Sequence, residues 1–441
     1  MLLAALVLAA VPPLSLPATR TTLDNGLTVI VSPDHSVPGV AVDLWYQVGS
    51  ADEQPGRTGF AHLFEHLMFM GARYAPYPKF DTLMEARGGS NNASTGQDGT
   101  HYYEVGPSNL LDTFLWLEAD RMQTLGQEMT QEKLETQRKV VLNERRQSYE
   151  NRPYGQADLL LDEHLWPVGH PYHHPVIGSA KDLEAATLQD VKDFFARWYV
   201  PSNATLSIVG DVDPAQAVAQ VKKYFAWMPK TSSPQPAAPP QVTLAKNDRV
   251  DLTDNVELTK VTFAWPSPKD GSEGDAAADL LSKILGGGKA SRLYELLVHQ
   301  KGLATDVGAA QSSQTLQSTF SLEVMGQPNV SADQLIAGMN AGLETLLAKG
   351  VTQAELDAAR ADLYTSVARQ LEGLVARADV LNHLQIRDGD PNGLQKDLAR
   401  YDRLTPKTFL EQVKGFLAQP HVTLVVTPKA TAPSTQKGAT R

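Results

Sequence analysis

Alternating apolar and polar residues predict strands at the start of each half of the chain. Residues 27–33 (LTVIVSP) and 40–50 (VAVDLWYQVGS) alternate in the first half, and residues 256–265 (VELTKVTFAW) alternate in the second. The positions of residues 40–50 that share one face are Val40, Val42, Leu44, Tyr46 and Val48. A helical pattern follows the strands in each half, over residues 59–71 and 274–288.

The ends of the two halves also resemble each other. Residues 187–210 and 405–426 each begin with a threonine, continue as a helix and finish as an apolar strand. Capping boxes at 331–334 (SADQ) and 352–355 (TQAE) predict two further helix starts. Residues 110–125 and 131–149 are predicted helices as well. The matching starts and ends of the two halves indicate an internal duplication. We therefore expect an α+β fold of two similar lobes, each an antiparallel-rich sheet packed by helices.

A segment rich in Pro, Ser and Ala divides the 441-residue chain into halves of similar length. Residues 229–247 have no helical or strand period and predict an extended linker. The expected domains are residues 19–228 and 248–430, and residues 431–441 are expected to form a disordered tail.

Residues 1–18 resemble a secretory signal, because a short apolar run ends in prolines and small residues. No Lys or Arg precedes this run, and an apolar tail that is disordered or packed on the core is the alternative. The run is too short to span a bilayer, and no later segment resembles a membrane span. We expect an exported protein, most simply one of the bacterial periplasm.

The composition argues against several classes of function. The net charge of −11 and the lack of a basic stripe argue against nucleic-acid binding. The absence of cysteine excludes disulfides, thiolate metal sites and cysteine nucleophiles.

The apolar stretch 59–71 (GFAHLFEHLMFMG) contains three polar groups, His62, Glu65 and His66, which share one face of a helix. We expect Thr58 to cap this helix and Gly71 to end it. A buried carboxylate beside two imidazoles needs compensation, which a divalent cation provides. Two core histidines paired with a glutamate are the alternative. The H-x-x-E-H pattern favours zinc, with Glu65 facing a metal-bound water as general base.

A third ligand has to come from elsewhere in the sequence. Glu144, within residues 132–155, is the best candidate, although spacing alone does not distinguish it from a solvated helix glutamate. His170, His173 and His174 are interpreted as loop residues rather than as a second metal site.

These motifs resemble those of the pitrilysin or M16 family of zinc peptidases, in particular its short members of the mitochondrial processing peptidase type. The resemblance covers nearly the whole chain after the signal-like segment. Glu144 follows the second histidine after 77 intervening residues, in the position of the family's ligand glutamate. The resemblance implies one zinc ion per chain, bound by His62, His66 and Glu144, with Glu65 as the catalytic base.

Residues 88–103 (GGSNNASTGQDGTHYY) resemble the family's edge strand beside the site. Asn92 and Ala93 match positions that contact the substrate backbone, so an extended peptide is the implied substrate. A turn leading into an ordinary strand is the alternative. Gln137 stands where the family often has a glutamate that supports the metal ligands, and an amide can still donate hydrogen bonds there.

The second half departs from the family pattern. Self-sufficient members carry an arginine and a tyrosine that contact the substrate and the developing oxyanion, but this chain has Val298 and Thr305 at those positions. Loss of one oxyanion donor costs roughly 100- to 1000-fold in rate. We therefore expect the zinc-bearing subunit of a heterodimer, whose homologous partner supplies the Arg/Tyr pair and closes with it as a clamshell around peptides.

Three hypotheses follow: a zinc endopeptidase, a catalytically silent scaffold or binding subunit, and a structural zinc protein. The intact Glu65 favours the endopeptidase, because a purely structural zinc site does not need a general base.

Overall fold

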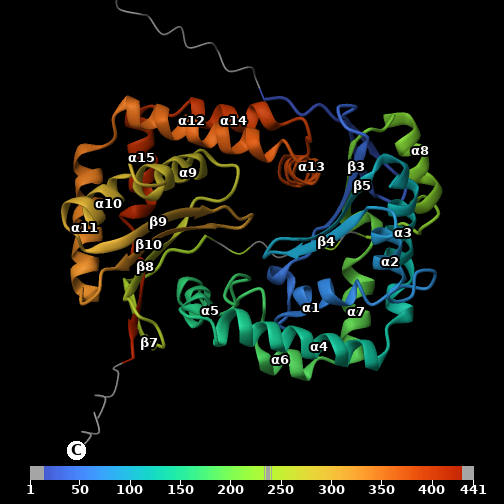
Figure 1. The fold of residues 1–441 in the computed structure, drawn as a ribbon, viewed down its shortest axis with the longest axis horizontal. Coiled ribbons are helices and arrows are strands. Elements are labelled where there is room, and N and C mark those ends of the chain that lie inside the picture. The colour runs from blue at the N-terminus through green and yellow to red at the C-terminus, as the bar shows by residue number, and fades with distance from the viewer. Residues whose placement is uncertain (1–13, 233, 235–238, 240, 430–441) are drawn as a thin grey trace, which may run out of the picture.

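The computed structural model describes residues 14–232, 234, 239 and 241–429, and it contains two sheets, each packed by helices. Figure 1 shows these as two lobes, with the first half of the chain on the right and the second half on the left. The predicted α+β class and two-lobed architecture are confirmed. The predicted tail (431–441) and residues 1–13 of the signal-like segment lie outside the described residues.

The first sheet has the strand order β1-β2-β6-β3-β5-β4, so β4 lies at one edge. Its strands are β1 (Thr19–Thr22), β2 (Thr28–Pro33), β3 (Gly39–Tyr46), β4 (Ser90–Thr95), β5 (Thr100–Pro107) and β6 (Ala204–Gly210). The helices of this half are α1 (Phe60–Leu67), α2 (Lys79–Glu85), α3 (Leu111–Glu128), α4 (Gln131–Arg145), α5 (Gly155–Leu165), α6 (Ala180–Ala185), α7 (Leu188–Trp198) and α8 (Pro214–Phe225).

The second sheet has the order β7-β11-β8-β10-β9. Its strands are β7 (Asp248–Asp254), β8 (Lys260–Ser267), β9 (Ala304–Ser312), β10 (Ser318–Gly326) and β11 (Val422–Pro428). The helices are α9 (Glu273–Gly286), α10 (Arg292–Tyr294), α11 (Ala332–Lys349), α12 (Gln353–Gln370), α13 (Leu374–Asp388), α14 (Leu394–Asp402) and α15 (Pro406–Leu417).

The pairing pattern makes the duplication visible. In the first sheet β2 runs parallel to β6, and the pairs β6–β3, β3–β5 and β5–β4 are antiparallel. In the second sheet β7 runs parallel to β11, and β11–β8, β8–β10 and β10–β9 are antiparallel. The two sheets therefore have the same topology, and β1 is an addition to the first.

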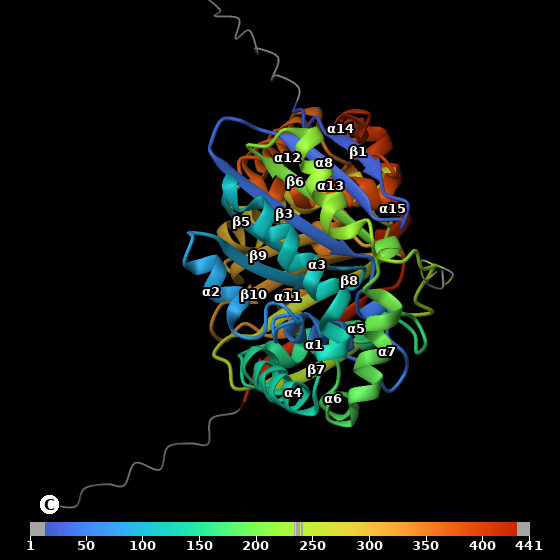
Figure 2. The ribbon, with the colours of Figure 1, turned by 90° about the vertical axis from the view of Figure 1, so that its right-hand side faces the viewer.

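Each sheet is covered on one face by a helix from the other half of the chain. Helix α13 packs on β3 and β6, while α5 packs on β8 and β11. In both views α13 lies beside β3 (Figures 1 and 2). Leu381 of α13 joins Ile30 and Val209 in one buried cluster, and Ala157 of α5 joins Leu424 in another. This reciprocal exchange ties the lobes together along their length.

Local signals in the sequence set the helix starts. The side chains of Thr187, Ser331, Thr352 and Thr405 each accept a hydrogen bond from the backbone N–H three residues later. These caps confirm the predicted starts of α7, α11, α12 and α15, because a capping oxygen satisfies a donor that the helix leaves unpaired.

A cleft of about 690 Å³ lies between the lobes. The β4–β5 hairpin, α13 and the loop around residues 312–315 line it. Among the described helices, none combines the length and apolar character needed to cross a membrane. The described residues of the linker (229–247) contain neither helix nor strand.

Candidate metal centre

The helix that carries the H-x-x-E-H motif is α1. Phe60, Leu63, Phe64 and Leu67 are buried and pack into the core of the first lobe. The opposite face holds the polar side chains, which are only partly buried. The helical period thus buries the apolar side and leaves His62, Glu65 and His66 on the partly buried side, as the shared helix face predicted.

A carboxylate from outside the helix caps its N-terminus. The fully buried Glu53 accepts hydrogen bonds from Gly59 N (2.8 Å) and Ala61 N (2.7 Å). The expectation that Thr58 caps the helix is wrong, because its hydroxyl donates instead to Asp182 at 2.7 Å. The N-cap is Gly59, whose φ of +87° favours glycine.

The C-terminal end of α1 also differs from the sequence-based expectation. The helix ends at Leu67, with Met68 as its C-cap, so Gly71 does not end it directly. Gly71 has a φ of +82° and turns the chain, and a Cβ there would approach Tyr77 N to 2.0 Å. This glycine is therefore needed for the turn rather than for the cap.

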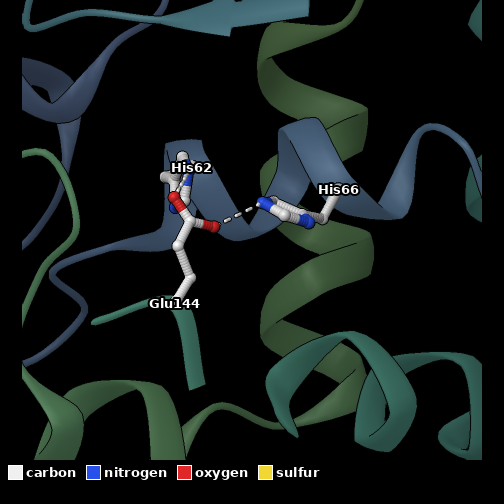
Figure 3. A group of neighbouring side chains, drawn as sticks. All are labelled: His62, His66 and Glu144. Carbon is white, nitrogen blue, oxygen red and sulfur yellow. Dashed lines mark ion pairs between the residues drawn. The ribbon is translucent and has the colours of Figure 1, made fainter. Parts of the chain in front are cut away.

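Glu144, in the last turn of α4, faces both histidines (Figure 3). Its Oε1 lies 3.7 Å from His62 Nε2 and its Oε2 lies 3.3 Å from His66 Nε2. One ligand atom from each of the three residues lies within 4.8 Å of the others. Two imidazole nitrogens and a carboxylate are a donor set that suits zinc, and three protein ligands leave a position open for water. The residues therefore fit the ion that the motif implies.

Burial shifts the pKa values of two side chains in this group. Burial, reinforced by the neighbouring His66, lowers the pKa of His62 to about 4, so its imidazole stays neutral at ordinary pH. Neutral imidazole is the form that binds a metal. Burial also raises the pKa of Glu65, and a hydrogen bond from Thr95 acts in the opposite direction. A base with a raised pKa is better able to accept a proton near neutral pH.

The edge strand β4 runs beside this centre. Thr95, its last residue, donates a hydrogen bond from Oγ1 to Glu65 Oε2 at 2.5 Å. Asn92 is exposed on the strand, and Ala93 packs against the core of the first lobe. The N–H of Ala93 donates to Asn92 Oδ1 at 2.9 Å. Among the described strands, none pairs with the outer side of β4, and this edge can accept another strand.

Gln137 lies on α4, but its hydrogen-bond partner is not a metal-site residue. Its Nε2 donates to Met70 Sδ at 2.8 Å. Within the part of the chain that the structure describes, Gln137 makes no hydrogen bond to His62, His66 or Glu144.

Val298 and Thr305 lie in the second lobe, on the π-helical turn η5 (Glu295–Gln300) and on β9. Val298 packs against that lobe's core. The Thr305 hydroxyl is exposed and donates to Met325 O at 3.2 Å. Within the described residues, neither side chain has an unpaired hydrogen-bond donor.

A second polar group, which the sequence analysis did not identify, joins the lobes. His101 Nδ1 of β5 lies 3.1 Å from Asp43 Oδ1 of β3 and 4.0 Å from Asp379 Oδ1 of α13. Burial lowers the pKa of His101, but the hydrogen bond and charge of Asp43 outweigh it, so the pKa is raised overall. His101 and Asp43 therefore form a hydrogen-bonded pair beside Asp379 of the other half of the chain. Sequence could not identify this group because α13 comes from the other half of the chain.

The three loop histidines have structural partners. His170 Nδ1 accepts from Tyr172 N at 3.1 Å, His173 Nδ1 lies 2.8 Å from Trp166 O, and His174 lies 3.6 Å from Glu53. Their interpretation as loop residues agrees with these contacts.

Two models of protein families match this chain. The family model "Insulinase (Peptidase family M16)" matches residues 28–166, and "Peptidase M16 inactive domain" matches residues 185–363. The zinc protease PqqE of Helicobacter pylori is 34% identical over 375 residues, which are 82% of this chain and 84% of that protein.

Solved structures share the fold. A crystal structure of a protease from Helicobacter pylori superposes with a TM-score of 0.88 at 29% identity, covering 94% of this chain and all of that one. The periplasmic protease PqqL of Escherichia coli has a TM-score of 0.78 at 18% identity, covering 96% of this chain and 50% of that one, a likeness of fold. On this evidence the chain belongs to the M16 family of peptidases.

Proposed function

We propose that this chain is a zinc-dependent endopeptidase that hydrolyses peptides or unfolded polypeptide segments. The observation that carries the proposal is the position of Glu65 on the same helix face as two histidines whose Nε2 atoms converge on Glu144. A purely structural zinc site does not require a carboxylate that is held beside its ligands without being one of them.

Each side chain then has a defined task. His62, His66 and Glu144 would hold one zinc ion, which supplies a more acidic bound water and polarises the scissile carbonyl. Glu65 removes the proton from the attacking water and returns it to the leaving amine. Thr95 holds one oxygen of Glu65, and the other makes no hydrogen bond within the described residues.

The substrate is proposed to add to the outer edge of β4 as an extended strand. Main-chain hydrogen bonds give affinity with little demand on side-chain identity. Asn92 and Ala93 are the residues proposed to contact it, and the Asn92 carboxamide must release Ala93 N for the peptide to bind there.

The oxyanion-binding half of the site is proposed to come from a homologous partner subunit with an Arg/Tyr pair. This chain has Val298 and Thr305 at the corresponding positions, and the Thr305 hydroxyl is bonded within its own sheet. We also propose that the chain is exported to the periplasm, on the basis of its signal-like N-terminus. N-terminal sequencing of the protein recovered from a periplasmic fraction checks the export.

Hydrolysis of a quenched-fluorescent peptide library by the zinc-loaded chain, alone and with the partner, tests the proposal. Activity that needs the partner and disappears in Glu65→Gln, while zinc stays bound, supports the divided site. Full activity of the chain alone contradicts the heterodimer. Retained zinc without hydrolysis under either condition favours a catalytically silent scaffold.

A further inference from the structure

The edge strand and the general base share a direct contact. Thr95 Oγ1 donates to Glu65 Oε2 at 2.5 Å, and no other hydrogen bond to Glu65 exists within the described part of the chain. A glutamate has three side-chain torsions, so one bond to a fixed donor determines which way its carboxylate points. Thr95 is the residue that makes this bond.

The end of β4 that carries Thr95 is fixed from several sides. Thr95 pairs with Thr100 across the hairpin, and the Thr100 hydroxyl lies 3.4 Å from Thr95 Oγ1 while donating to Val48 O at 2.9 Å. Beyond Thr95, the carbonyl of Gly96 accepts from Ser50 N at 3.1 Å. The hydroxyl that donates to Glu65 therefore lies on a backbone segment that is held by hydrogen bonds to its neighbours.

The second lobe also holds this hairpin. Asp98 at its tip accepts from Thr315 N (2.8 Å) and from the Tyr172 hydroxyl (2.5 Å), which in turn accepts from Leu316 N (3.0 Å). The tip of the hairpin is thereby attached to the loop after β9. Thr95 stands between this anchored tip and the stretch of β4 on which a peptide would add.

We propose that Thr95 is a positioning residue that aligns the Glu65 carboxylate with a peptide bound on the edge of β4. Strand β4 then has two tasks, because it pairs with the peptide and also orients the Glu65 carboxylate. This inference rests on the proposed peptidase function. A group that reacts from a fixed orientation gains rate through alignment, so the effect belongs in kcat rather than in substrate binding.

The test compares Thr95→Val, which keeps the shape and removes the hydroxyl, with Thr95→Ser, which keeps the hydroxyl. Thr319→Val is the matched control, because Thr319 lies on the equivalent hairpin of the second lobe and makes no side-chain hydrogen bond within the described residues. Each zinc-loaded variant is assayed with the partner subunit for kcat, KM and zinc content.

Thr95→Val is expected to lower kcat by roughly 10- to 100-fold, as loss of a supporting partner does in metal sites, with KM and zinc content unchanged. Thr95→Ser is expected to recover most of the rate, and Thr319→Val to match the wild type. Wild-type kcat in Thr95→Val overturns the inference, as does equal loss in Val and Ser variants. Loss of zinc in Thr95→Val also overturns it, because the residue then acts on the metal site as a whole.

Crystal structures of zinc-loaded wild type and Thr95→Val provide a readout that does not depend on activity. The Glu65 carboxylate is expected to leave its position in the variant, and an unchanged position overturns the inference. A wild-type protein that cleaves nothing rejects the proposed function instead, and these structures alone then decide the role of Thr95.

Discussion

Ser207 on β6 donates its hydroxyl hydrogen to Asn382 Oδ1 on α13 at 2.7 Å, across 175 positions of sequence. Asn382 is fully buried, and its Nδ2 also donates to the backbone oxygen of Asp43 at 3.0 Å. One amide thus satisfies polar groups on two strands of a sheet that belongs to the other half of the chain. The helix exchange has a specific polar contact at its centre.

Replacing this amide should destabilise the whole molecule. Asn382→Ala leaves buried polar groups without partners, which costs about 1–3 kcal/mol in the free energy of unfolding. Urea denaturation followed by circular dichroism measures it. Asn392→Ala is the control and should cost under about 0.5 kcal/mol, because among the described residues its exposed side chain bonds only to Ala18. Equal effects of the two variants would refute the role given to Asn382.

Substitutions of Glu144 and Gln137 should have very different effects on zinc affinity. Glu144→Ala removes a proposed ligand and should weaken zinc binding beyond the ~10- to 100-fold that loss of an outer partner costs. Gln137→Ala should leave zinc affinity close to that of the wild type, because its amide donates to Met70 Sδ. Competition with a fluorescent zinc chelator measures both affinities. A large loss in Gln137→Ala would show that the amide turns toward the ligands when the metal binds.

The metal-free protein should lose stability in acid through His62. Its pKa is lowered from 6.5 to about 4 by burial, so below pH 6.5 the unfolded chain binds a proton that the folded chain excludes. Above pH 6.5 this group does not lower the free energy of unfolding. As the pH falls toward 4, it lowers that free energy by on the order of 3 kcal/mol.

This effect is measured by urea unfolding of chelator-treated protein between pH 4.5 and roughly 7, a window that follows from the unfolded and folded pKa values. His62→Gln should flatten the dependence, while the exposed His299→Gln should not. An unchanged slope in His62→Gln would assign the acid sensitivity to other groups.

Peptide binding to the edge of β4 should follow a period of two residues. In an added strand, alternate N–H groups face the sheet, so N-methylation at those positions should weaken binding by roughly 10-fold. Methylation of the residues between them should have little effect. Binding to Glu65→Gln, which should not cleave the peptide, gives the affinities by fluorescence anisotropy. Equal losses at every position would argue against strand addition at Ala93.

The local parts of this fold could be predicted from the sequence. The alternation around Val42 predicts β3, and Thr405 predicts the start of α15. Both signals depend only on neighbouring residues. The metal-site histidines share a helix face for the same reason. Glu144 needed a family resemblance, because nothing in its own segment marks it as facing α1.

Other features depend on contacts that sequence spacing does not encode. The sequence analysis did not identify Glu53, because only folding places its carboxylate at the start of α1. Thr58 resembles an N-cap, but Asp182, 124 positions away, takes its hydroxyl. Likewise, the exchange of α5 and α13 follows from the packing of both halves together and has no local signature.

The exchange of α5 and α13 between the halves resembles that of a domain-swapped dimer, but within a single polypeptide. In each sheet, apolar residues pack against a helix that comes from the other half of the chain. A duplicated gene whose two products had already traded these helices would yield this architecture on fusion. We therefore expect the two halves, produced as separate chains, to bind each other through these packed surfaces.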